Sequence, residues 1–130
     1  SKEIKERVAD VLDLTGLTPV KDFFPSQISA GMKQRVAIAR GFVTEPDLLL
    51  MDEPFVGLDP KASHLLKGMM REVCDAGGAI FFSTHVLEVA EKLCDKVAII
   101  KGGKLIRSGT METVKGDDSL EDVFLELEGE

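Results

Sequence analysis

Apolar residues recur along the chain with two kinds of spacing, one typical of helices and one typical of strands. Helical spacing predicts five helices, within residues 4–12, 31–43, 60–76, 86–93 and 120–127. Short apolar or β-prone runs predict strands at residues 48–51, 79–83, 97–100 and 104–107. Helices that alternate with strands in this way are typical of an α/β fold.

Two of these helices carry clear start signals. Asp59 precedes Pro60, and aspartate caps a helix whose first position suits proline. Ser119 with Asp122 resembles a capping box for the last helix. Both signals support the helices that the apolar spacing predicts.

Glycine and proline mark the connections between elements. The pair "GG" at residues 102–103 lies between two β-prone runs. It predicts a hairpin that pairs residues 97–100 with 104–107. Residues 16–28 hold two prolines and no sustained period, so we expect a loop there.

The stretch "LLLMDEP" at residues 48–54 places four apolar residues directly before two carboxylates, Asp52 and Glu53. A continuous apolar run predicts a strand buried on both faces, as in a parallel sheet. Unpaired carboxylates are costly in such surroundings. Asp52 and Glu53 are therefore expected at the carboxyl end of the strand, where open α/β sheets bind ligands. A surface strand that ends in a solvated acidic turn is the alternative.

The strand at 79–83 also leads into polar residues, "STH" at 83–85. Parallel strands end at the same edge of a sheet, so His85 and the two carboxylates can converge on one ligand. Asp52 suits a hard cation such as Mg²⁺. Glu53 can orient or deprotonate a water, and His85 can donate a hydrogen bond to a phosphate oxygen. A capping or core role is the alternative for His85.

A further polar site is predicted at "SAG", residues 29–31. Ser29 caps the following helix, and Gly31 allows a ligand to approach the backbone closely. Helix N-termini of this kind bind anions. A plain N-cap is the alternative for Ser29.

Composition narrows the function. The net charge of −7 and the pI near 4.9 argue against a nucleic-acid partner, and there is no basic block. No apolar run reaches the roughly 18 to 20 residues that span a bilayer. Cys74 and Cys94 match no metal or redox spacing, so we expect buried free thiols.

Four motifs in order resemble those of an ABC-transporter ATPase. The stretch "QISAGMKQRVAIARGFVTEPDLLLMDEPFVGLDP" resembles the family's signature motif, Walker B strand and D-loop. "FFSTH" resembles its switch-histidine strand, and "DKVAIIKGGKLIRSGT" its closing hairpin. The resemblance covers nearly the whole chain. It implies the C-terminal part of a P-loop NTPase-like domain, with a mainly parallel sheet, flanking helices and a closing hairpin.

The resemblance also implies a division of the chain and two cofactors. Residues 1–45 would be part of the helical, signature-bearing subdomain. Residues 46–116 would form the Walker B, D-loop and switch-histidine part of a RecA-like core, and residues 117–130 a C-terminal helix. The cofactors would be ATP and Mg²⁺.

Individual residues acquire roles from this resemblance. Asp52 would help hold Mg²⁺, Glu53 would polarise the attacking water, and His85 would contact the γ-phosphate of the same nucleotide. The signature loop would reach across a dimer to the γ-phosphate held by the opposing subunit, and the D-loop aspartate would lie at that interface. The residues that would contact or adjoin the nucleotide in this way are Ser29, Ala30, Gly31, Met32 and Asp59.

The chain departs from the family pattern at several places. Ala30 replaces a glycine, and its methyl group is expected to crowd the approach of backbone to phosphate. Met32 loses a polar contact, and Val56 stands where the D-loop often has serine. The phosphate-cradling motif G-x-x-x-x-G-K-[ST] does not occur. We therefore expect a portion of a longer ATPase that is inactive alone, and a natural half-domain is the alternative.

The expected function is that of an ATPase subunit that drives a membrane transporter. Its partners would be a second ATPase subunit, identical or different, and a transmembrane permease that holds it on the cytoplasmic face of the membrane. The tail "SLEDVFLELEG" resembles those of bacterial exporter ATPases, so we expect export rather than import. Two alternatives are a non-catalytic module that completes a partner's ATP site through its signature motif, and a soluble ABC-type ATPase.

Overall fold

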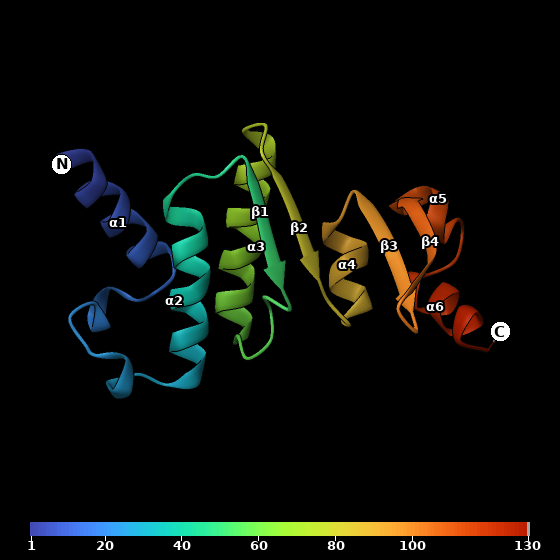
Figure 1. Ribbon diagram of the computed structural model, residues 1–130, viewed down its shortest axis with the longest axis horizontal. Coiled ribbons are helices and arrows are strands. Elements are labelled where there is room, and N and C mark those ends of the chain that lie inside the picture. The colour runs from blue at the N-terminus through green and yellow to red at the C-terminus, as the bar shows by residue number, and fades with distance from the viewer. Residues whose placement is uncertain (130) are drawn as a thin grey trace. The chain divides into compact units, whose positions relative to one another are not determined.

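The computed structural model describes residues 1–129 of the chain (Figure 1). It divides into two compact units, Ser1–Ser83 and a second unit that begins at Thr84. The three-part division expected from the family resemblance, with boundaries at 45 and 116, is a functional one and stays a prediction.

The first unit contains three long helices and one pair of strands. Its elements are α1 (Lys2–Leu14), α2 (Ala30–Val43), β1 (Leu48–Asp52), α3 (Pro60–Asp75) and β2 (Ala79–Ser83). Each helix begins at a side chain that accepts a hydrogen bond from the first turn: Ser1, Ser29 and Asp59. The predicted helix start at Asp59 is thus confirmed. The segment predicted as a loop also contains two short 3₁₀ helices, Thr18–Val20 and Pro25–Gln27.

The two strands of the first unit form a parallel pair. Their register runs from Leu48 opposite Ala79 to Asp52 opposite Ser83. α3 connects them and packs beside β2 (Figure 1). Both strands therefore end at the same edge, as the sequence predicts, with polar residues side by side.

The two faces of this strand pair differ in burial. Leu49, Met51, Ile80 and Phe82 are half-buried on one face. Residues on the other face are exposed, and we call this the open face; its members are Leu48, Leu50, Asp52, Ala79, Phe81 and Ser83. The expectation of a strand buried on both faces is wrong here, because nothing in the described first unit covers the open face.

The second unit is built around a hairpin. Its elements are α4 (Leu87–Leu93), β3 (Lys96–Lys101), β4 (Lys104–Thr110), α5 (Met111–Lys115) and α6 (Leu120–Gly129). The antiparallel pairing of β3 with β4 confirms the hairpin predicted from the two glycines, which both have positive φ. β4 is longer than predicted, and its register shifts between Ile99 and Ile100. The short helix α5 was not predicted.

Apolar side chains of the second unit gather in one core. Its buried members, all 8% exposed or less, are Ala90, Ile99, Met111, Val114, Leu120, Val123 and Leu127. At the start of α6 the backbone N–H of Asp122 donates to Ser119 Oγ at 3.1 Å, which agrees with the predicted cap. Neither Cys74 nor Cys94 forms a disulfide, and both are half-buried rather than buried as expected.

Among the described residues, no helix is both long enough and apolar enough to cross a bilayer.

Candidate functional site

The carboxyl ends of β1 and β2 are joined by side-chain hydrogen bonds. Ser83 Oγ donates to Asp52 Oδ1. The backbone N–H of Glu53 donates to Ser83 Oγ at 2.9 Å and to the Ser83 carbonyl oxygen at 3.1 Å. One serine therefore contacts both members of the acidic pair, and the pair lies at the edge where the sequence predicts it.

The backbone at Glu53 has an unusual conformation. Its φ is +46°, in the left-handed region that residues with a Cβ rarely adopt. The next turn is closed by a hydrogen bond from the Val56 N–H to the Glu53 carbonyl oxygen at 3.2 Å. The strand therefore ends sharply after Asp52, and the half-buried Glu53 begins the turn that leads to α3.

The N-terminus of α2 is the predicted anion site. Ser29 Oγ accepts the N–H of Met32 at 3.2 Å, so the capping role proposed from the sequence is present. Ser29 and Ala30 are exposed, and Gly31 is half-buried. The remaining N–H groups of this first turn and the positive end of the helix dipole favour an anionic ligand.

The start of α2 is attached to the turn that follows β1. A Cβ at Gly31 would lie 3.4 Å from the Gly57 carbonyl oxygen, so the two backbones approach closely. Farther along the helix, Gln34 Nε2 donates to the Pro54 carbonyl oxygen at 3.4 Å. The predicted signature loop and the predicted D-loop are thus in contact within one chain.

Asp59 has a structural role at the end of this turn. Its Oδ1 accepts the N–H of Ala62 at 2.7 Å, and its Oδ2 lies 3.2 Å from Arg35 Nη2. These contacts cap α3 and connect it to α2. The interface role expected for Asp59 from the family resemblance stays a prediction.

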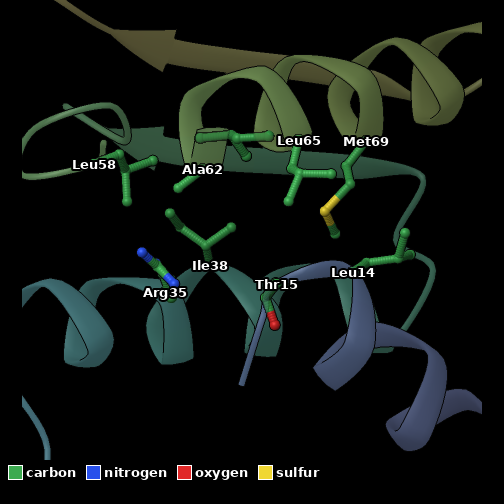
Figure 2. Close-up of a pocket in the computed structure, with 9 residues that line it drawn as sticks. Leu14, Thr15, Arg35, Ile38, Leu58, Ala62, Leu65 and Met69 are labelled. Carbon is green, nitrogen blue, oxygen red and sulfur yellow. The ribbon is translucent and has the colours of Figure 1, made fainter. Parts of the chain in front are cut away.

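A small cavity lies between α2 and α3 (Figure 2). Figure 2 shows Ile38 facing Leu65 and Met69 across it, and Arg35 at one end. The cavity holds about 20 Å³, close to the minimum for a single water. It is too small for a nucleotide and none of the predicted site residues lines it, so the candidate site is the exposed surface at the strand ends and the α2 terminus.

His85 belongs to the second unit. It is exposed and follows Thr84, whose Oγ1 accepts the N–H of Val86 at 3.0 Å. The expected convergence of His85 with Asp52 and Glu53 on one ligand therefore stays a prediction.

The ligand atoms near the acidic pair can be compared with those that a cation requires. Within residues 1–129, no group of three or more His, Cys, Asp and Glu side chains could hold a metal by itself. Mg²⁺ needs no such cage when a phosphate ligand is present, because one or two carboxylates, phosphate oxygens and water complete its shell. Asp52, an exposed carboxylate at a strand end, fits that use.

Three contact residues of the site were not predicted. Gln34 and Arg35 lie on the α2 face toward the turn, and the sequence indicates Ser83 only as one of several polar residues at a strand end. Their partners lie 20 to 31 positions away in sequence. The one sequence signal that pointed to such a contact is the expectation that the two parallel strands, which lead into Asp52 and Ser83, end at the same edge of a sheet.

Comparison with known proteins relates the chain to one family. The family model described as "ABC transporter" matches residues 2–56. The chain is thus similar to ABC transporter ATP-binding domains over most of its length, and its α/β fold is that of their P-loop NTPase-like ATPase core.

Individual relatives agree with this assignment. The "Methionine import ATP-binding protein MetN 1" of Staphylococcus epidermidis is 42% identical over 114 residues, which are 87% of this chain and 33% of that protein. A solved "ATP binding subunit of ABC transporter" superposes with a TM-score of 0.92 at 36% identity, covering 98% of this chain and 55% of the other. The chain spans about a third of the length of such curated relatives.

A third match concerns assembly. The structure titled "Dimeric structure of a post-hydrolysis state of the ATP-binding cassette MJ0796 bound to ADP and Pi" has a TM-score of 0.76 at 26% identity. It covers 85% of this chain and 48% of that protein.

Proposed function

We propose that this chain carries the hydrolytic and signature part of an ATPase subunit that drives a membrane transporter. The observation that carries the proposal is the strand end at which Asp52, Glu53 and Ser83 meet. Such a cluster, in a chain similar to ABC transporter ATP-binding domains, supports metal-assisted phosphoryl transfer to water.

Asp52, Glu53 and His85 have separate tasks in this proposal. Asp52 holds Mg²⁺, which when bound neutralises charge on the phosphate oxygens of ATP. Glu53 orients the attacking water and accepts its proton. The left-handed turn at Glu53 directs its backbone away from the strand, so the two adjacent carboxylates can serve different atoms. His85 donates a hydrogen bond to the γ-phosphate.

The α2 terminus serves a second nucleotide. Ser29, Ala30, Gly31 and Met32 bind the γ-phosphate of ATP held by another ATPase subunit, and Asp59 lies beside that interface. Exposure of Ser29 and Ala30 and the anion preference of a helix N-terminus support this role. The dimeric ADP-bound relative, a protein of the same fold, supports pairing of two such subunits.

The proposal includes a membrane permease as the second partner, with the ATPase subunit on the cytoplasmic face. It covers ATP-driven transport in either direction. The methionine relatives are named as import proteins, so they give no support to the export direction expected from the tail.

The test is Glu53→Gln in the full-length protein that contains this chain. Loss of the proton acceptor should lower steady-state ATP hydrolysis by on the order of 100-fold or more, whereas equilibrium binding of ATP should persist. Hydrolysis near the unmodified rate would overturn the role given to Glu53.

Glu45→Gln is a matched control. Glu45 also has a positive φ, +49°, and it is exposed. Its carboxylate pairs with Arg7 at 3.3 Å on the surface, and such pairs contribute little. This variant makes the same chemical change in the same backbone conformation, so it should leave hydrolysis unchanged.

A further inference from the structure

Ser83 has no task in the proposed hydrolysis, yet it contacts both acidic residues. It is the last residue of β2 and lies directly opposite Asp52 in the parallel register. Both side chains are exposed on the open face. Its position is therefore fixed by strand pairing rather than by a mobile loop.

The hydroxyl of Ser83 can make both contacts at once. A serine hydroxyl has one proton to donate and two lone pairs to accept. The proton goes to Asp52 Oδ1, and a lone pair receives the Glu53 N–H at 2.9 Å. The donor and acceptor capacities of the group match its two partners.

Each contact restricts one neighbour. The bond to Oδ1 limits rotation of the Asp52 carboxylate, and so limits where its second oxygen can lie. The bond from the Glu53 N–H, shared with the Ser83 carbonyl oxygen at 3.1 Å, holds the residue whose φ is +46°. Groups that orient a metal-binding carboxylate commonly change metal affinity by 10- to 100-fold when removed.

We propose that Ser83 is a positioning residue for the divalent cation, which sets the orientation of Asp52 and anchors the backbone of Glu53. The inference rests on the function proposed above. It adds a residue from the neighbouring strand to the cation site, at a position that the acidic pair alone does not identify.

The experiment measures cation binding rather than turnover. Mn²⁺ replaces Mg²⁺ as the probe, since both suit carboxylate and water ligands. Its affinity for the full-length protein is determined by electron paramagnetic resonance with a non-hydrolysable ATP analogue. Three variants at position 83 are compared with the unmodified protein: Ser83→Ala and Ser83→Val lack the hydroxyl, and Ser83→Thr keeps it.

The Thr and Val variants form a matched pair. Their side chains have nearly the same shape, and both suit a strand, so they differ mainly in the hydroxyl. Ser108→Ala in β4 is a second control, because it removes an exposed strand serine from the other unit.

The expected result is Mn²⁺ binding weakened on the order of 10-fold in the Ala and Val variants, with near-normal binding in the Thr variant. Hydrolysis should recover at high Mg²⁺ in the Ala variant, which distinguishes positioning from a general loss of structure. Equal affinity in the Thr and Val variants, with normal binding by the unmodified protein, would overturn this inference alone. No Mn²⁺–nucleotide binding by the unmodified protein would overturn the proposed function and this inference together.

Discussion

The two compact units of the chain treat their apolar residues differently. The second unit, the shorter of the two, collects seven buried side chains from one strand of the hairpin and three helices into one core. The first unit leaves Leu48, Leu50 and Phe81 exposed by 58%, 67% and 66% on one side of its strand pair. Apolar content alone therefore does not determine burial.

Both strand pairs leave apolar residues exposed, since Ile100 and Leu105 of the hairpin are 65% and 62% exposed. The difference lies in how closely helices cover the other face of each pair. In the second unit, α4, α5 and α6 contribute buried side chains to the core that includes Ile99 of β3. In the first unit, α3 packs beside β2, and the open face has no cover within the described unit. A continuous apolar run thus predicts a strand that suits cover on both faces. Whether both faces are covered depends on which other elements pack against the strand.

The largest expected effect compares the two environments directly. Leu120 in the second unit is 1% exposed, so Leu120→Ala should lower the free energy of unfolding by about 2–5 kcal/mol through lost burial and a residual cavity. Leu50→Ala on the open face should change it by about 0.5 kcal/mol or less. Urea unfolding of the chain measures both. Equal losses would mean that Leu50 is covered in solution.

Association of the 130-residue chain should show a smaller effect, through the open face. Exposed apolar strands recruit other chains, so light scattering should show self-association that weakens in Leu50→Lys and Phe81→Lys. Ile100→Lys, at a side chain 65% exposed in the second unit, is the matched control. A monomer at high concentration that retains an exposed Leu50 would contradict the prediction.

The smallest effect is expected at the helix terminus of the first unit. Ala30 is exposed at the first position of α2, so its methyl group contributes little to packing. Ala30→Gly in the full-length protein should leave ATP hydrolysis unchanged or raise it, because the only group removed is a methyl that we expect to crowd a phosphate. A large loss of steady-state hydrolysis would reveal a positive role for Ala30.

Elements with local signals were predictable from the sequence. The Asp59-Pro60 helix start and the hairpin at 102–103 depend on neighbouring residues alone, and both are present in the structure. α5 has only five residues, too few for apolar periodicity to show. The register shift beside Ile99 depends on how two strands pair, which the pattern of either strand does not contain.

The candidate site, too, was predictable only where a local signal exists. The placement of Asp52 and Glu53 at a strand end followed from the cost of burying carboxylates. Their contacts with Ser83 depend on the parallel register. The contact between Arg35 and Asp59 joins residues 24 positions apart, and no single-sequence pattern specifies such a pair.

The left-handed backbone of Glu53 means that selection for stable folding and selection for the proposed chemistry favour different residues. Glycine adopts a φ of +46° without the Cβ clash that costs other residues about 1–2 kcal/mol. In a library of all substitutions at this position, cellular abundance would rank glycine above glutamate, whereas the proposed function requires ATP hydrolysis to rank glutamate first. At position 53 the backbone conformation thus favours glycine, whereas the proposed chemistry needs glutamate.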